Sequence, residues 1–212
     1  MDAALLANLL RECPVTPLPS GGFLTCVARL SYPALDKPRK IEGSDGEPKY
    51  SASLLFPLEA DLTLLKAEYQ RVAMAQWPNG FPNGLKLSLK KQDDKADTDG
   101  YEIGGFYLSA SSFRQPGMVD ARMNVITNPG IFYGGCYVRA SIRIFAYDKK
   151  LSKGVSAGLN NLQFLADGDA FGGATRAADD FKPIGSAPAP ASTANGATPP
   201  TGSPQAASSS LF

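Results

Sequence analysis

The chain has 212 residues and nearly balanced charge, with 21 Lys and Arg against 20 Asp and Glu. This length fits one domain with an appendage, and a net charge of +1 gives no global argument for a nucleic-acid or membrane partner. The absence of histidine excludes His-based nucleophilic triads and the usual zinc sites. Because Cys13, Cys26 and Cys136 form no CxxC pair, we expect no disulfide framework and a reducing, cytoplasmic compartment.

Composition divides the chain into three parts. Residues 1–20 are expected to form an N-terminal arm or short helix, and residues 21–181 the folded domain. In residues 182–212, 25 of 31 side chains are Ala, Pro, Ser, Gly or Thr, a composition that buries too little apolar area to offset the entropy of folding. We therefore expect a disordered C-terminal tail that ends in an apolar pair, Leu211 and Phe212. No apolar run is long enough for a membrane span or follows a signal-peptide pattern.

The first elements follow clear periodicities. Residues 23–30 and 50–56 alternate with period two, as strands with one buried face do. Residues 58–72 carry apolar side chains at the spacing of an amphipathic helix, which we expect to end at Trp77. Two further alternating runs, at residues 85–90 and 106–111, predict strands after that helix.

The later segments complete a mainly β fold. A shorter helix is predicted around residues 156–166, because Leu159, Leu162 and Leu165 are three residues apart and Gly168 can terminate it. Short strands with Gly-rich turns favour a small barrel or sandwich over a parallel α/β sheet. The pattern is compatible with an OB-fold, a five-stranded Greek-key barrel, here with an inserted α-helix.

The strand expected over residues 136–147 has two contrasting faces, one of them entirely apolar. The opposite face carries, in chain order, Tyr137, Arg139, Ser141, Arg143, Phe145 and Tyr147. Aromatic rings interleaved with cations suit single-stranded nucleic acid, because the rings stack on unpaired bases and the guanidinium groups pair with phosphates. We therefore predict that its aromatic and arginine side chains contact DNA. The alternative is that a helix or loop covers this face and that the arginines pair with acidic clusters.

Further cations extend this predicted surface. Arg39 lies in an expected Pro-rich loop after Tyr32, and the other basic patches fall near the strands at residues 85–90 and 136–147. The additional phosphate contacts that we predict are Arg39, Lys86, Lys90, Lys149 and Lys150.

An acidic run at residues 93–99 raises one enzymatic alternative, a Mg²⁺-dependent nuclease that uses its aspartates. An EF-hand pattern fails there, because Lys95 and Phe106 occupy its first and twelfth positions. We expect a hydrophilic loop, with no metal, no cofactor and no enzymatic activity.

Several blocks resemble the tailed-phage OB-fold single-stranded DNA-binding proteins. The resemblance covers about residues 21–173, and its most specific parts are Tyr-x-Gly-x-x-Val-Arg-Ala at residues 133–140 and Lys-Gly-Val-Ser-x-Gly-Leu at residues 153–159. It implies a non-enzymatic OB barrel that protects single strands during phage DNA replication, recombination and repair. RNA binding remains a close alternative, and a phage virion or assembly β-protein with a spacer tail is the structural one.

The resemblance also implies an acidic C-terminal tail with a terminal aromatic residue, which competes with DNA and recruits the phage polymerase and helicase. Phe212 matches that aromatic residue, whereas the tail lacks acidic side chains and the nearest acidic aromatic element is at residues 179–181. We therefore expect Leu211 and Phe212 to bind a partner pocket, and a homodimer stays open.

Overall fold

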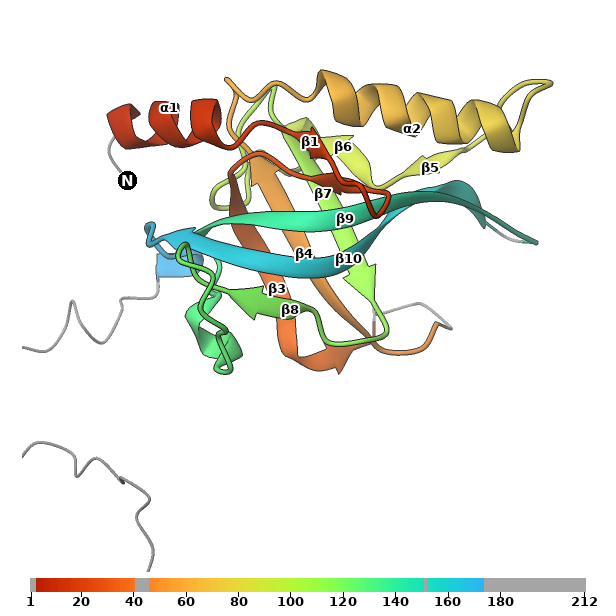
Figure 1. The fold of residues 1–212 in the computed structure, drawn as a ribbon. Helices are drawn as coiled ribbons and strands as arrows, with labels where there is room; N and C mark the ends of the chain where they lie inside the picture. The colour runs from red at the N-terminus through yellow and green to blue at the C-terminus, as the bar shows by residue number, and fades with distance from the viewer. Residues whose placement is uncertain (1–2, 41–45, 151, 174–212) are drawn as a thin grey trace, which may run out of the picture. The chain divides into compact units, whose positions relative to one another are not determined.

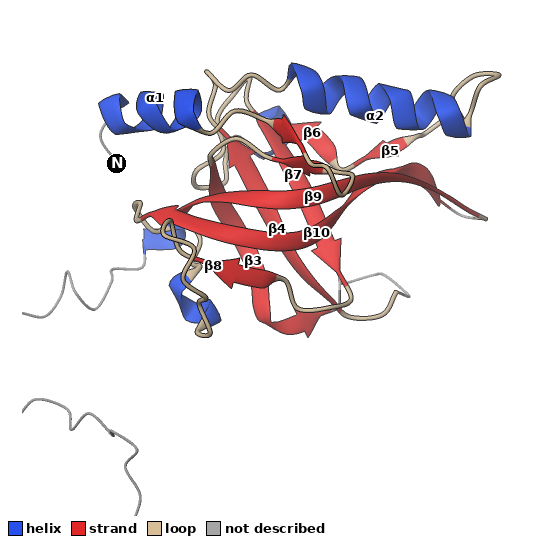
Figure 2. Cartoon of the chain, in the orientation of Figure 1, coloured by secondary structure: helices blue, strands red, loops and turns tan. Residues whose placement is uncertain are grey.

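The computed structural model describes residues 3–40, 46–150 and 152–173 (Figure 1). The predicted tail, with Leu211 and Phe212, lies outside them. Within the described residues, no helix is both long and apolar enough to cross a membrane. The fold is mainly β, and the α-helices among these residues, α1 (Ala3–Glu12) and α2 (Thr63–Gln76), lie outside the sheet (Figure 2).

Five long strands close into a barrel: β3 (Ala28–Arg39), β4 (Lys49–Phe56), β7 (Phe106–Ser112), β9 (Tyr137–Lys149) and β10 (Ser152–Ala166). They pair in the order β9, β3, β4, β7, β10, and β10 pairs with β9 to complete the circle. Among these pairs only β7 with β10 is parallel. This is the Greek-key connectivity of the OB-fold, so the predicted fold class is confirmed.

Short strands and 3₁₀ turns lie around the five-stranded barrel. The short strands are β1 (Thr16–Pro17), β2 (Phe23–Leu24), β5 (Lys86–Leu87), β6 (Leu89–Lys91) and β8 (Gly117–Val119). The described residues also contain three 3₁₀ turns, which are η1 (Asp93–Lys95), η2 (Pro129–Ile131) and η3 (Phe171–Gly173). The β1–β2 hairpin extends the sheet beyond β9, whereas β5 and β8 pair with β10 in parallel.

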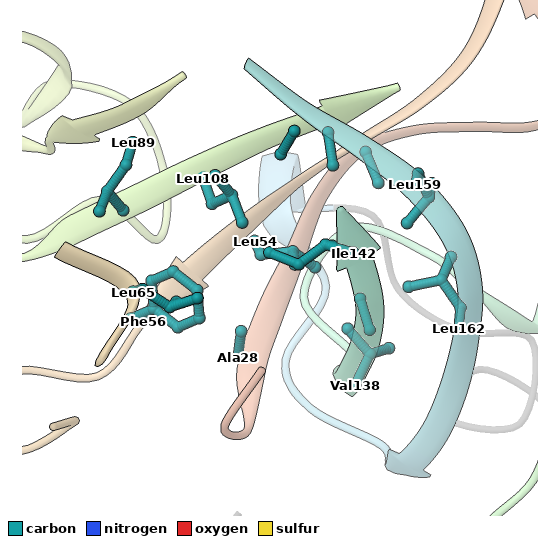
Figure 3. Close-up of a cluster of buried hydrophobic side chains, with 14 of the residues drawn as sticks. Ala28, Leu54, Phe56, Leu65, Leu89, Leu108, Val138, Ile142, Leu159 and Leu162 are labelled. Carbon is teal, nitrogen blue, oxygen red and sulfur yellow. The ribbon is translucent and has the colours of Figure 1, made fainter. Parts of the chain in front are cut away.

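The barrel interior is filled by the inward side chains of all five long strands, because alternate residues of each strand point to the core. Figure 3 labels Ala28, Leu54, Phe56, Leu65, Leu89, Leu108, Val138, Ile142, Leu159 and Leu162. Helix α2 adds Leu65, Tyr69 and Ala73 to this core. The Tyr69 hydroxyl lies 2.6 Å from Ser88 Oγ, which ties α2 to the β5–β6 segment. The predicted amphipathic helix is therefore present and Trp77 is its C-cap, but it begins at Thr63, so Leu58, expected on its apolar face, lies before it and is exposed.

The helix predicted around residues 156–166 is wrong, because this segment is the long strand β10. The register against β9 shifts between Leu159 and Asn161, so Asn160 is the extra residue of a β-bulge. The bulge converts the two-residue spacing of inward side chains into a three-residue step from Leu159 to Leu162. That step imitates one turn of a helix in the sequence.

The prediction of a Pro-rich loop after Tyr32 is also wrong, because β3 continues as a strand to Arg39. Register irregularities between Ser31 and Ala34, and again before Arg39, accommodate the prolines. Tyr32 takes a left-handed conformation with φ of 46°, which non-glycine residues rarely adopt. Arg39 is thereby paired with Lys49 at the end of the β3–β4 ladder.

Replacement of Leu108 by alanine tests the core. Leu108 is fully buried between β4 and β6, and a Leu→Ala change at such a site leaves a cavity that costs about 3–5 kcal/mol. We expect urea unfolding to show this loss, whereas Leu58→Ala, at a leucine that is 56% exposed, should change stability by less than about 0.5 kcal/mol. Equal effects of the two variants would contradict the packing described.

Candidate nucleic-acid interface

Strand β9 has the two-faced character that its sequence predicts. Val138, Ala140, Ile142 and Ile144 are buried in the barrel. On the outward side, Arg143 and Phe145 are exposed, with 44% of Phe145 accessible, and Tyr147 is half-buried. The half of β9 next to the β10 hairpin therefore presents an aromatic and cationic outer surface.

The other end of β9 is covered. Tyr137 is only 9% exposed, and the Arg29 guanidinium lies 5.6 Å from its ring centroid. Arg139 donates from Nε to the Thr25 carbonyl at 3.2 Å and from Nη2 to the Pro14 carbonyl at 3.4 Å. The structure therefore separates Tyr137 and Arg139 from the exposed set of Arg143, Phe145 and Tyr147.

A row of small outward residues continues the exposed part of β9 across the barrel. Arg143 is paired with Gly158 of β10, Gly158 with Ser111 of β7, and Ser111 with Ser51 of β4. Residues directly opposite each other in a sheet share a face, so these four positions form one transverse row. Flanking positions are also small: Ser156 faces Phe145, and Ser53 faces Ser109 with their hydroxyl oxygens 3.4 Å apart. We call this surface the small-residue path.

Exposed aromatic rings stand at the far side of this path. Phe113, directly after β7, is 63% exposed, and Lys49 Nζ lies 4.5 Å from its ring centroid. Tyr32 is 62% exposed, with Lys95 Nζ 5.8 Å from its ring. Neither ring was among the predicted site residues. For Phe113 a signal existed, because the alternation of Tyr107, Ser109 and Ser111 continues to it.

The predicted cations lie around the same surface. Lys149 and Lys150 are exposed at the end of the β9–β10 hairpin. Lys86 is paired with Gly154 of β10, and Lys90 with Tyr107 of β7, while exposed Arg39 lies at the end of β3. In OB-folds the second and third strands and the loops after strands one and four bind oligonucleotides. Those elements correspond here to β4, β7, the β3–β4 connection and the β9–β10 hairpin.

Acidic groups near the surface are engaged in local structure. Asp148 lies 3.1 Å from Lys153 and accepts a hydrogen bond from the Trp77 indole at 3.3 Å. In the acidic run, Asp93 accepts from the Gly104 amide and Asp99 from the Gly172 amide. Among the described residues, no group of three or more acidic or cysteine side chains is placed to hold a metal ion.

The buried thiols offer no nucleophile. Burial raises the pKa of Cys26 and of Cys136 to about 12. Since the thiolate is the reactive form of cysteine, both side chains are protonated at neutral pH and act as small apolar groups in the core. The chemistry that this region offers is stacking, hydrogen bonding and ion pairing.

Comparison with known proteins identifies relatives of the whole barrel. A family model described as Enterobacter phage Enc34, ssDNA-binding protein, matches residues 23–191. Putative protein p50 of Acyrthosiphon pisum secondary endosymbiont phage 1 is 34% identical over 165 residues, covering 72% of this chain and 88% of the relative.

Solved structures are similar as well. The single-stranded DNA-binding protein from bacteriophage Enc34 in complex with ssDNA is 25% identical, with a TM-score of 0.66, and covers 76% of this chain and 99% of that chain. The single-stranded DNA-binding protein encoded by bacteriophage T7 is 13% identical, with a TM-score of 0.51, over 76% of this chain and 97% of that one, a likeness of fold alone. The chain therefore belongs to the family of phage single-stranded DNA-binding proteins represented by that of Enterobacter phage Enc34.

Proposed function

We propose that the small-residue path is where this protein binds single-stranded DNA. Its family is described as phage single-stranded DNA-binding protein. The observation that carries the proposed location is the transverse row from Arg143 through Gly158 and Ser111 to Ser51. Small side chains let a nucleic-acid backbone approach the sheet closely, and both ends of the row carry exposed rings and cations. Such a surface contacts features that every base and phosphate shares, which makes binding largely independent of sequence.

The aromatic side chains supply stacking platforms. Phe145 and Tyr147 stack on bases at the β9 end of the path, and Phe113 does so beside β7. Tyr32 has an exposed ring on β3 that serves the same role. Tyr137 and Arg139, predicted from the sequence as DNA contacts, pack against other parts of the protein in this conformation. They support the path by fixing β9 at its covered end.

The cations contact phosphates. Arg143 lies in the row itself, and the other cations that we assign to phosphates are Lys49, Arg39, Lys86, Lys90, Lys149 and Lys150. They surround the path on three connections of the barrel, so a strand that crosses the path meets a cation wherever it enters or leaves. The protein coats transient single strands in the host cytoplasm during replication, recombination and repair, and it performs no catalytic step.

The C-terminal residues are proposed to recruit partners. Leu211 and Phe212 form an apolar pair at the end of a Pro-, Ala- and Ser-rich segment, a composition that suits a tethered docking motif. The phage DNA polymerase and helicase are the proposed partners. A homodimer is the other association that we propose to test.

Loss of the two β9 rings should weaken binding. Stacking contributes roughly 1–3 kcal/mol per base, so Phe145→Ala with Tyr147→Ala is expected to lower affinity for a 30-mer at least about tenfold. Fluorescence anisotropy with labelled single-stranded DNA and duplex competitor measures this. Leu58→Ala with Leu64→Ala removes two exposed side chains, one before helix α2 and one in its first turn, and is the matched control. If both double variants bind DNA with equal affinity, the two β9 rings are not part of the binding site.

A side chain added at Gly158 should block the path and leave the fold intact. A Cβ there would lie 3.6 Å from the Arg143 carbonyl oxygen and 3.8 Å from Phe145, which is ordinary contact. Overpacking of a fitted contact costs roughly 1–3 kcal/mol, so Gly158→Leu is expected to lower DNA affinity about tenfold and Gly158→Ala much less. Both variants should keep the wild-type melting temperature. Undiminished binding by folded Gly158→Leu would contradict this path.

The salt dependence of the DNA affinity reports the number of phosphate contacts. If about four to six phosphates are neutralised, log affinity should fall with log salt at a slope of about −3 to −4, because each contact on a single strand contributes about −0.7. Lys149→Ala with Lys150→Ala should reduce this slope by about 1.4. Arg11→Ala with Lys66→Ala, two cations on the helices, should leave it unchanged. A slope near zero in the wild-type protein would rule out phosphate contacts.

A further inference from the structure

A pocket of about 790 Å³ opens on the barrel surface directly beside the small-residue path. Its floor consists of outward residues of β9 and β10, among them Arg139, Ser141, Asn161 and Gln163. Ser141 is paired with Asn161, and the next outward pair along the same strands is Arg143 with Gly158. The pocket floor and the path are therefore consecutive parts of one outer face.

The floor is rich in amides because of the β-bulge. Asn160 is the inserted residue, so Asn160 and its neighbour Asn161 both line the pocket, where a regular strand would turn one of them inward. Asn161 donates from Nδ2 to Ser141 Oγ at 3.1 Å. A side chain at position 117 would collide with the Asn161 amide oxygen, so Gly117 leaves room for the Asn161 side chain.

The walls of the pocket are apolar, and hydrogen bonds hold the wall formed by the turn after β8 in place. Leu18 and Leu24 come from the β1–β2 hairpin, and Met123 and Val125 from the turn after β8. Met123 is 68% and Val125 77% exposed, although both are large apolar side chains. Met123 also takes a left-handed conformation, with φ of 68°, and strained residues of this kind cluster at functional sites.

Asp120 holds that turn in place. Its Oδ1 accepts hydrogen bonds from the backbone amides of Arg122 at 2.8 Å and Asn124 at 2.9 Å, and its Oδ2 accepts from the Asn124 side chain at 2.8 Å. The Asp120 carbonyl accepts from Gln163 on the pocket floor at 3.2 Å, and Gln163 also contacts the Met123 sulfur at 3.6 Å. The exposed wall is thus fixed to the floor by hydrogen bonds.

We infer that this pocket is a subsite for an unstacked base of the bound single strand. The inference rests on the proposed path, which leads past Arg143 to the pocket. A base presents apolar faces and an edge of donors and acceptors, and the pocket offers Met, Leu and Val walls with amides on the floor. Asparagine and glutamine amides match base edges. No acidic side chain lines the pocket, so its lining does not repel the phosphates of a bound strand.

Photocrosslinking locates the base. The full-length protein is bound to a 30-mer that contains 5-iodo-2′-deoxyuridine, irradiated and digested with trypsin. Cleavage after Arg122, Arg139, Arg143 and Lys149 places Met123 in the peptide 123–139 and both β9 rings in the peptide 144–149. We expect crosslinks in both peptides, with fragment spectra that assign the first to Met123. DNA retention with crosslinks confined to residues 144–149 would overturn the subsite and leave the path standing, whereas no retention of DNA would overturn both.

A wall variant gives a second, independent readout. Met123→Ala with Val125→Ala removes exposed side chains only, so it should fold normally, and it is expected to lower affinity for the 30-mer about tenfold through lost apolar contact with a base. Leu58→Ala with Met74→Ala is the matched control, since both side chains are more than half exposed on another part of the molecule. The salt slope should stay at the wild-type value, because no phosphate contact is removed. Unchanged affinity of the wall variant would overturn the subsite.

Discussion

The pairing of β9 with β10 is the constraint on which the rest of this structure depends. These two strands are paired from Tyr137 to Ala166 around a tight hairpin, and the pairing completes the circle of five strands. Their inward residues fill a large part of the core, so the register between them cannot slip without turning apolar side chains to water. The same register fixes which residues face outward. Core packing therefore positions Arg143, Phe145 and the small residues beside them, with no separate scaffold for the proposed binding surface.

A glycine at position 154 of β10 is a requirement of this arrangement, because a Cβ there would collide with the Lys86 carbonyl oxygen and Tyr147. Gly154 packs under the Tyr147 ring and against the Lys86 carbonyl, and Gly158 lies beside Phe145. Glycine in a strand interior is unfavourable for the strand itself, because it loses more backbone entropy and packs no side chain. The cost is offset by long pairing with β9 on one side and contacts with β5 and β7 on the other. Stability drawn from the ladder therefore permits glycine at these two positions of β10.

The sequence predicts a strand of this structure where its alternation of apolar and polar residues is unbroken, and it fails where an extra residue interrupts that alternation. The alternation in β9 runs without a break, and its inward apolar face was predicted correctly, whereas only the second half of the opposite face is open to solvent. In β10 the extra residue Asn160 changes the spacing of the apolar side chains from two residues to three, so the sequence pattern indicates a helix where the structure has a bulged strand. The sequence left open that this face is covered, but it could not assign the covering to Tyr137 and Arg139. The groups that contact them, such as Pro14, Thr25 and Arg29, are more than 100 residues away in the chain.

Near-zero net charge is consistent with a surface of this kind. A protein with a net charge of +1 creates little field beyond the Debye length, about 8 Å at physiological ionic strength, so long-range steering toward DNA is weak. In the binding mode proposed here, affinity comes from cations within contact distance of phosphates and from rings that stack on bases. The structure separates the charges accordingly: aspartates of the acidic run accept backbone hydrogen bonds from Gly104 and Gly172, whereas Lys149 and Lys150 remain exposed at the hairpin end. Local placement of charge, and not its total, determines what such a neutral barrel can bind.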